Sequence, residues 1–108
     1  MDKSMNLGGS IVSKNIIENK GKLKWCFREP SVNDIDNGWR FLSEIDTDEF
    51  LENSKNMVVC DWGTIIKIEP AVAAIFDFPV GTELVLEYHD KKRYFVNAET
   101  GKYIKIMK

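Results

Sequence analysis

The stretch Gly-Trp-Arg-Phe-Leu-Ser at residues 38–43 predicts a strand, because its large side chains alternate between two faces. Trp39 and Phe41 share one face, while Arg40 and Leu42 share the other. An Asp-Asn-Gly sequence at its start indicates a turn. Tryptophans in such patterns lie in a core more often than at a contact surface, so we expect this segment to help build the fold.

Acidic residues are concentrated around this strand. Residues 29–53 contain eight acidic side chains against the single Arg40, which gives the segment a net charge of −7. The whole chain carries only −2, so the remainder carries +5. Acid concentrated beside aromatic residues and an arginine indicates a surface that meets something basic. The eight residues are Glu29, Asp34, Asp36, Glu44, Asp46, Asp48, Glu49 and Glu52.

Other strand patterns flank this segment. Residues 23–28 alternate in polarity, with Leu23, Trp25 and Phe27 on one predicted face. A proline then ends that strand, because proline cannot donate to a ladder. Further strands are predicted at residues 10–14, 57–60, 83–88, 93–97 and 103–107, and the apolar run at 57–60 suits a central strand.

Two segments have helix patterns. Residues 47–53 can be capped by Asp46 or Thr47, and the two acidic residues in the first turn suit the positive end of the helix dipole. A second short helix is predicted after a proline, at residues 71–76. Residues 64–68 fit either a strand or the entry to a helix.

Together these elements predict one α+β domain over residues 1–108, built on a mainly antiparallel twisted sheet with one or two short helices. Residues 1–9 are expected to be a flexible lead-in. An apolar fraction of 44% and twelve aromatic residues favour a folded globule over a disordered chain.

Composition also limits the partners and the compartment. The near-neutral charge argues against direct binding of nucleic acid, and no apolar run approaches the ~20 residues that span a membrane. The first residues lack the apolar core of a secretory signal. Cys26 and Cys60 lie in strand-like runs without a nearby ligand residue, which indicates free thiols in the cytoplasm.

No group of residues suits catalysis or metal binding. His89 is the only histidine and lies at a predicted hairpin tip, where it should be solvated. The Asp-x-Asp pairs at residues 34–36 and 46–48 lack the glycine and the distal glutamate of a calcium loop. We therefore expect no catalytic residue, no metal, no cofactor and no enzymatic activity.

Arg28 and Arg40 allow two interpretations. In the first, ion pairs join these guanidinium groups to Glu29, Asp34 or Asp36 within the fold. In the second, they help to present the acidic surface or contact a partner directly, since arginine and tryptophan are enriched among interface hot spots.

Several short motifs, taken in order, resemble the DUF2185 family, which is also described as the Imm33-like immunity proteins of bacterial polymorphic toxin systems. The similarity covers about residues 12–86. Residues 44–46 lack a glycine expected there, and residues 88–108 extend beyond the similar region as a hairpin. The motifs are Phe-Arg-Glu-Pro at 27–30, Gly-Trp-Arg-Phe-Leu-Ser at 38–43, Asp-Glu-Phe at 48–50, residues 65–70, and Phe-Pro-Val-Gly-Thr at 78–82.

The resemblance implies a cytoplasmic immunity protein, a monomer or weak dimer, that occludes a cognate toxin domain through an acidic and aromatic surface. A nuclease toxin fits the acid best, because its substrate groove is basic. The residues we expect to contact the partner are Trp39, Arg40, Asp46, Asp48 and Glu49.

The alternative is a small-ligand-binding or structural accessory domain. Its site would be an apolar pocket between sheet and helix, lined by Trp25, Phe41 and Trp62. A metabolite that raises the melting temperature would favour this alternative, whereas a neighbouring reading frame for a secreted toxin would favour the immunity protein.

Overall fold

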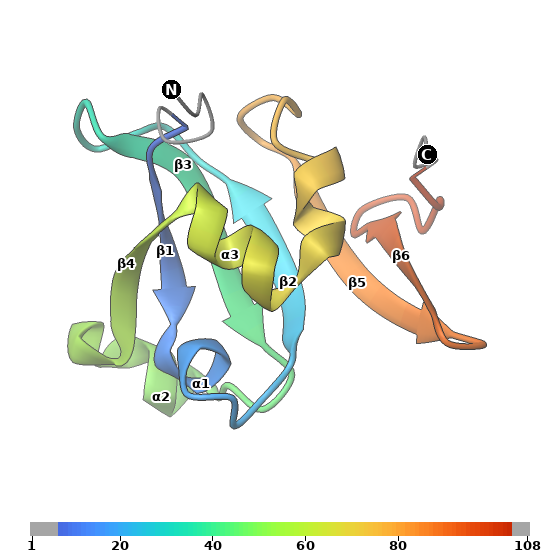
Figure 1. Cartoon of the computed structure of the whole chain (residues 1–108), viewed down its shortest axis with the longest axis horizontal. Helices are drawn as coiled ribbons and strands as arrows, with labels where there is room; N and C mark the ends of the chain where they lie inside the picture. Colours follow the sequence, from blue (N-terminus) through green and yellow to red (C-terminus); the bar gives the residue numbers. More distant parts are fainter. Residues whose placement is uncertain (1–6, 105–108) are drawn as a thin grey trace.

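A six-stranded mixed sheet organises the computed structural model, which describes residues 7–104 (Figure 1). The spatial order is β4-β1-β3-β2-β5-β6, and only the β1–β3 pair is parallel. This confirms the predicted α+β class with a mainly antiparallel sheet. The strands are β1 (Gly9–Ser13), β2 (Leu23–Arg28), β3 (Asp36–Ser43), β4 (Met57–Asp61), β5 (Glu83–His89) and β6 (Lys92–Asn97).

Short helices connect the strands, and they are more numerous than predicted. The helix that the sequence did not predict begins directly after β1, where the Ser13 side chain accepts a hydrogen bond from the backbone N–H of Asn15. Residues 64–68, which fitted either a strand or a helix, belong to a helix whose N-terminus is capped by the Asp61 side chain. The helices are α1 (Lys14–Ile17), α2 (Asp48–Glu52) and α3 (Trp62–Ile68), with 3₁₀ helices η2 (Ser54–Asn56) and η3 (Pro70–Ala74).

The apolar strand β4 lies at an edge of the sheet, so the prediction of a central strand is wrong. Among the described strands it pairs only with β1, and Val59 is 74% exposed. A continuous apolar run does not distinguish a strand covered on both faces from one that leaves half its side chains in water.

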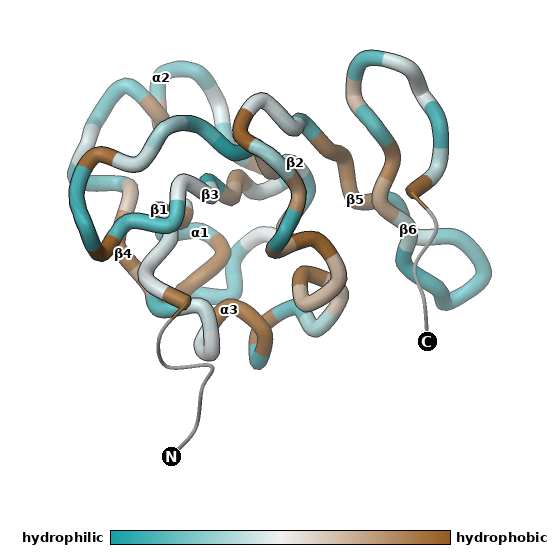
Figure 2. The backbone as a smooth tube through the Cα atoms, turned by 90° about the horizontal axis from the view of Figure 1, so that it is seen from above, coloured by the Kyte–Doolittle hydropathy of each residue, from teal (hydrophilic) through white to brown (hydrophobic). Residues whose placement is uncertain are grey.

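An aromatic cluster forms the centre of the core. Trp39 and Phe41 stack with ring centroids 6.2 Å apart, and Trp62 of α3 lies 5.9 Å from Phe41 and 6.4 Å from Trp39. Phe76 meets Trp62 edge-on at 4.8 Å. The predicted shared face of Trp39 and Phe41 is confirmed, and α3 packs over it (Figures 1 and 2).

An irregularity in β2 changes the predicted arrangement of its side chains. The register with β3 shifts between Leu23 and Trp25, as expected for a bulge at Lys24. Leu23 and Cys26 therefore point into the core, whereas Trp25 and Phe27 point to the opposite face. The prediction that Leu23 shares a face with Trp25 is wrong, because one extra residue reverses the alternation.

The last predicted strand is only partly observed. Tyr103 forms an isolated antiparallel bridge with Val96. Residues 105–107 of the predicted strand lie outside the described residues.

Gly38, near the start of β3, should not tolerate a side chain. Its φ is +89°, and a Cβ atom there would collide with the backbone oxygen of Glu29. We expect Gly38→Ala to lower the free energy of unfolding by about 3 kcal/mol, because strain and collision add. Gly101→Ala is the matched control, since its φ of +75° has open space around it, and it should cost about 1 kcal/mol. Urea denaturation of both variants measures the difference, and equal losses would contradict it.

Candidate functional site

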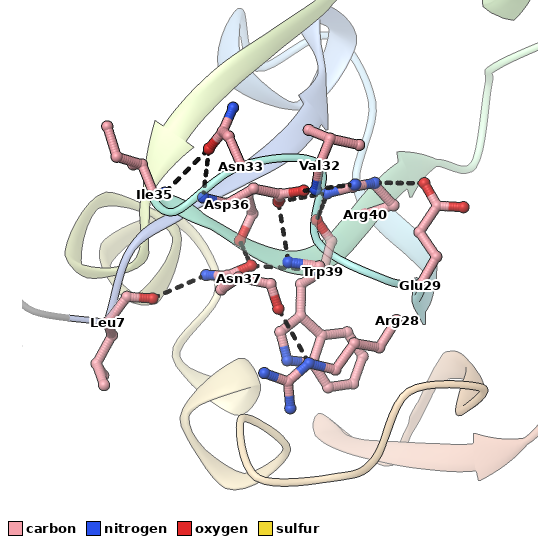
Figure 3. A network of polar contacts seen from close by, with 12 residues as sticks. Leu7, Arg28, Glu29, Val32, Asn33, Ile35, Asp36, Asn37, Trp39 and Arg40 are labelled. Carbon is pink, nitrogen blue, oxygen red and sulfur yellow. Dashed lines mark hydrogen bonds and ion pairs between the residues drawn. The ribbon is translucent and has the colours of Figure 1, made fainter.

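Arg40 is the centre of a polar network on β3 (Figure 3). Its side chain is only 4% exposed. Nη1 and Nη2 donate to the two oxygens of Asp36 at 2.8 and 2.9 Å, and Nε donates to Glu29 at 2.6 Å. The hydrogen bond from Arg40 holds the pKa of Asp36 far below its usual value, and the same bond raises the pKa of Arg40. The ion-pair interpretation is thus confirmed for Arg40, with Glu29 and Asp36 as its partners.

The same network shapes the loop before β3. Asp36 also accepts hydrogen bonds from the backbone N–H groups of Val32 and Gly38, both at 2.9 Å. Asn37 accepts from the Ser10 hydroxyl at 3.1 Å and donates to the carbonyl of Leu7 at 3.0 Å. These contacts attach the loop to β1 and make the network part of the fold.

Arg28 has a different role from the predicted ion pair. It donates to the backbone carbonyls of Asn37, Phe76 and Phe78 at 2.8 to 3.0 Å. Its guanidinium lies 5.7 Å from the Trp39 ring. Arg28 therefore fastens the segment after η3 to the sheet. Sequence spacing could not show this, because the carbonyl groups of Phe76 and Phe78 are 48 and 50 residues away.

The five predicted contact residues divide into buried and exposed groups. Trp39 is 0% and Arg40 3% exposed, so the expectation that they contribute to a surface is corrected by the structure. The core requires the ring of Trp39, and two carboxylates enclose the Arg40 charge. Asp48 and Glu49 are exposed in the first turn of α2, which Thr47 caps through the N–H of Phe50.

Asp46 lies between these groups and is half-buried. Its carboxylate accepts from the Ser43 N–H at 2.7 Å, the Ser43 and Ser13 hydroxyls at 2.6 and 2.9 Å, and the Asn15 amide at 2.8 Å. Burial alone would raise the pKa of Asp46, but these hydrogen bonds hold it below its usual value. Asp46 thus joins the ends of β1 and β3 rather than capping α2.

The acidic segment is not one patch in space. Seven residue steps separate the ends of β3, which is about 23 Å at the rise of an extended strand. Glu29, Asp34 and Asp36 lie at the first end, and residues 44–52 follow the other. We call these the first and second acidic ends.

The sheet face that points away from α3 is mostly apolar and holds Trp25. Cross-strand pairing places Leu42, Trp25, Val85 and Val96 in one row, and Val59, Ile11, Arg40 and Phe27 in the next. We call these eight residues the open face. Trp25 is 40% exposed, whereas Trp39 and Trp62 are buried. The bulge at Lys24 concealed this position from the sequence pattern.

The pocket of the alternative hypothesis does not form as predicted. Trp25 lies on the opposite face of the sheet from Phe41 and Trp62. A different pocket of about 190 Å³ lies beside α3 and β5 and is partly polar. In it Glu69, which is 5% exposed, accepts from the Tyr88 hydroxyl at 3.2 Å and pairs with Arg93 at 3.0 Å.

The remaining reactive side chains have structural partners or are enclosed. His89 is half exposed, and its Nε2 lies 2.9 Å from Glu87 and 3.2 Å from the Tyr103 hydroxyl. Cys26 and Cys60 are free thiols, and burial raises the pKa of both. Within residues 7–104, no group of three or more His, Cys, Asp or Glu side chains could hold a metal, and no described helix is long and apolar enough to cross a membrane.

The fold and these features define a small α+β domain whose most specific motif, Gly-Trp-Arg-Phe, is structural. The immunity protein Imm33 domain matches residues 10–105, and the chain therefore belongs to the Imm33 immunity protein family. The match extends beyond the motifs at residues 12–86 and includes the β5–β6 hairpin. Comparisons with curated proteins and with solved structures gave no match.

Arg40→Met should strongly destabilise the fold. The Asp36 side chain is only 7% exposed, so its charge would lose its partner without regaining water, whereas Glu29 is half exposed. We expect the free energy of unfolding to fall by roughly 3 kcal/mol. Lys20→Met, which breaks the exposed Lys20–Glu18 pair, should change it by less than about 1 kcal/mol. Similar losses in urea denaturation would contradict the buried role of Arg40.

Asp36 should also make stability depend on pH. Its pKa is lowered in the folded state, so below its unfolded pKa of ~3.9 the unfolded chain binds more protons. Its stabilising contribution is present above this value and is lost as the pH falls. The stability difference between wild type and Asp36→Asn should therefore be largest above about pH 5 and shrink below about pH 4. Urea titrations at each pH measure this, with the exposed Asp34→Asn as control, and a constant difference would contradict it.

Proposed function

We propose that this chain is a non-enzymatic immunity protein that binds a cognate bacterial toxin domain in the cytoplasm and occludes its active site or substrate groove. The observation that carries the proposal is the Imm33 match over residues 10–105. An immunity protein needs a stable scaffold and a surface complementary to its toxin. The buried network around Arg40 supplies the first of these, so the second must lie elsewhere on the chain.

The second acidic end fits the role of the surface that meets the toxin first. Its exposed acids are Glu44, Asp48, Glu49 and Glu52, which have no ion-pair partner among the described residues. Clustered exposed charge attracts an oppositely charged partner over a Debye length and raises association rates by roughly 10 to 10³-fold. Asp46 supports this surface from within, because it holds the chain that leads into α2.

A nuclease domain is the toxin class that this charge favours. A groove that binds a phosphate backbone is rich in lysine and arginine, and exposed carboxylates can occupy the places of phosphate groups. The chain itself, with a net charge of −2, would not compete for the nucleic acid. We propose that one monomer binds one toxin domain.

Co-expression tests the function directly. The toxin domain encoded beside this chain is expressed in a bacterial host with and without it. We expect growth to be restored only when both are present, and the purified chain to inhibit the toxin at a 1:1 ratio. Failure of the chain to bind or to inhibit the toxin domain would contradict the proposal.

Charge reversal tests the second acidic end. The double variant Asp48→Lys with Glu49→Lys should lower the association rate about 10-fold or more and weaken its dependence on salt. The matched control is Asp77→Lys with Glu99→Lys, which makes the same charge change at two exposed turn positions away from α2. Stopped-flow association at several salt concentrations measures both variants. Equal rates for the two would mean that α2 does not steer the partner.

A further inference from the structure

Helices cover one face of the sheet, whereas the other face is covered only in part, at Arg40 and Val96. The helices that contribute buried side chains to the core cluster are α1, α3 and η3, through Ile16, Trp62, Ile65 and Val72. All of these pack against the face that holds Trp39 and Phe41. The remaining α-helix, α2, buries no residue. Within residues 7–104, no helix therefore contributes a buried side chain to the open face.

The open face is apolar in its two rows except at Arg40, whereas β5 and β6 carry charged residues farther along the same side. Four of its side chains, Ile11, Phe27, Leu42 and Val85, are partly exposed, and Val59 is 74% exposed. Trp25 lies between Leu42 and Val85 in the row that these residues form across β3, β2 and β5. The one charged residue among the eight is Arg40, and its ion pairs with Asp36 and Glu29 neutralise its charge. A partner that covers this face would not have to bury an unpaired charge.

Acid borders this apolar surface on more than one side. The first and second acidic ends lie at opposite ends of β3, about 23 Å apart, with the open face between them. Glu83, which is exposed, faces the same side as Phe27 on the neighbouring strand. Apolar residues bordered by exposed carboxylates on these sides are the arrangement of an interface with a hydrophobic centre and a polar rim.

We propose that the open face is the docking surface for the toxin domain, with Trp25 as its central anchor and the two acidic ends as its rim. The occupant is a protein surface with an apolar spot bordered by lysine and arginine on two sides. This rests on the proposed immunity function and names the surface that performs it. Tryptophan is the residue type most characteristic of interface hot spots, and a partly exposed one in an apolar row is placed to fill a pocket on a partner.

The dimensions suit such an interface. The exposed part of the open face runs over five strands from β4 to β5, which at a spacing of ~4.8 Å is about 19 Å wide. A surface of about 19 by 23 Å projects on the order of 400 Å², roughly half of the ~800 Å² that each partner contributes to a standard interface. The acidic ends supply the remaining area, so the apolar row and the acid are parts of one surface.

A second copy of this chain is a poor occupant. Both ends of the face are acidic, so two copies stacked face to face would bring acid against acid in either orientation. Like charges placed opposite each other cost several kcal/mol in an interface. The same charges attract a partner whose border is basic.

The decisive comparison uses Trp25→Ala and Ile68→Ala. Both side chains are 40% exposed, but Ile68 lies on α3, on the covered side of the sheet. The probe is the toxin domain encoded beside this chain, inactivated by mutation of its active site. We expect Trp25→Ala to weaken its binding about 30-fold or more and Ile68→Ala to change it less than about 3-fold. Thermal unfolding checks that both variants fold, and Val59→Ser, at the exposed edge, provides a second variant that leaves Trp25 in place.

The outcomes separate the two proposals. Binding by wild type that Trp25→Ala and Val59→Ser leave unchanged would overturn the docking face while leaving the immunity function intact. Absence of binding by wild type would overturn the immunity function and the toxin as occupant of this face. Self-association of wild type that Trp25→Ala abolishes, measured by sedimentation velocity, would overturn the toxin as occupant in favour of a second copy.

A spectroscopic readout tests the same face without altering Trp25. The chain has three tryptophans, and Trp39 and Trp62 are at most 1% exposed. In the chain labelled with 5-fluorotryptophan, only the fluorine signal of Trp25 should respond to exchange of H₂O for D₂O. Addition of the unlabelled toxin domain should shift this signal and remove its solvent response. A Trp25 signal that is unchanged in the saturated complex would overturn the proposal.

Discussion

The buried charge of Arg40 is the constraint on which the architecture depends. An arginine side chain that is only 4% exposed must be neutralised, and the chain supplies Asp36 from its own strand and Glu29 from directly after the preceding one. Glu29 and Asp36 lie at the two ends of the β2–β3 connection, so both ends have to meet beside Arg40. Gly38 permits the close approach that this requires, because Glu29 N–H donates to its carbonyl at 2.9 Å. The two ion pairs of Arg40 thus hold both ends of the loop together next to Gly38.

The acidic residues of segment 29–53 fall into two groups, those bonded within the fold and those exposed to solvent. Asp36 and Asp46 serve the fold, because each accepts several hydrogen bonds from backbone and side-chain groups of neighbouring segments. Asp34, Glu44, Asp48 and Glu49 remain exposed. The formal charge of −7 in the sequence therefore overstates the free charge and conceals its separation along β3. Charge counted along a chain becomes informative about a partner only after the internally paired groups are set aside.

The predictable parts of this structure are those that depend on local pattern. Alternation predicted β3 with Trp39 and Phe41 on one face, and turn residues predicted the β5–β6 hairpin. The features that the sequence did not predict depend on a bulge of one residue or on contacts between segments that are distant in the chain. The bulge at Lys24 reverses which side chains of β2 reach the core, and the neighbours of β4 follow from how the sheet assembles. Among the expected contact residues, the sequence could not separate the half-buried Asp46 from the exposed Asp48 and Glu49, because the groups that bond Asp46 include Ser13 and Asn15, about 30 residues away.

The Gly-Trp-Arg-Phe motif links the fold to the proposed surface through its alternation. Its two aromatic residues fill the packed face, while Arg40 and Leu42 belong to the open face. A neutral apolar residue at position 40 would not recruit Glu29 and Asp36, and the loop that carries the first acidic end would lose its anchor. An unpaired arginine there would place a bare charge in the middle of the apolar rows. Only the paired arginine gives an open face that is apolar at its centre and acidic at its ends, so the residues that resemble a binding motif act by shaping the surface beside them.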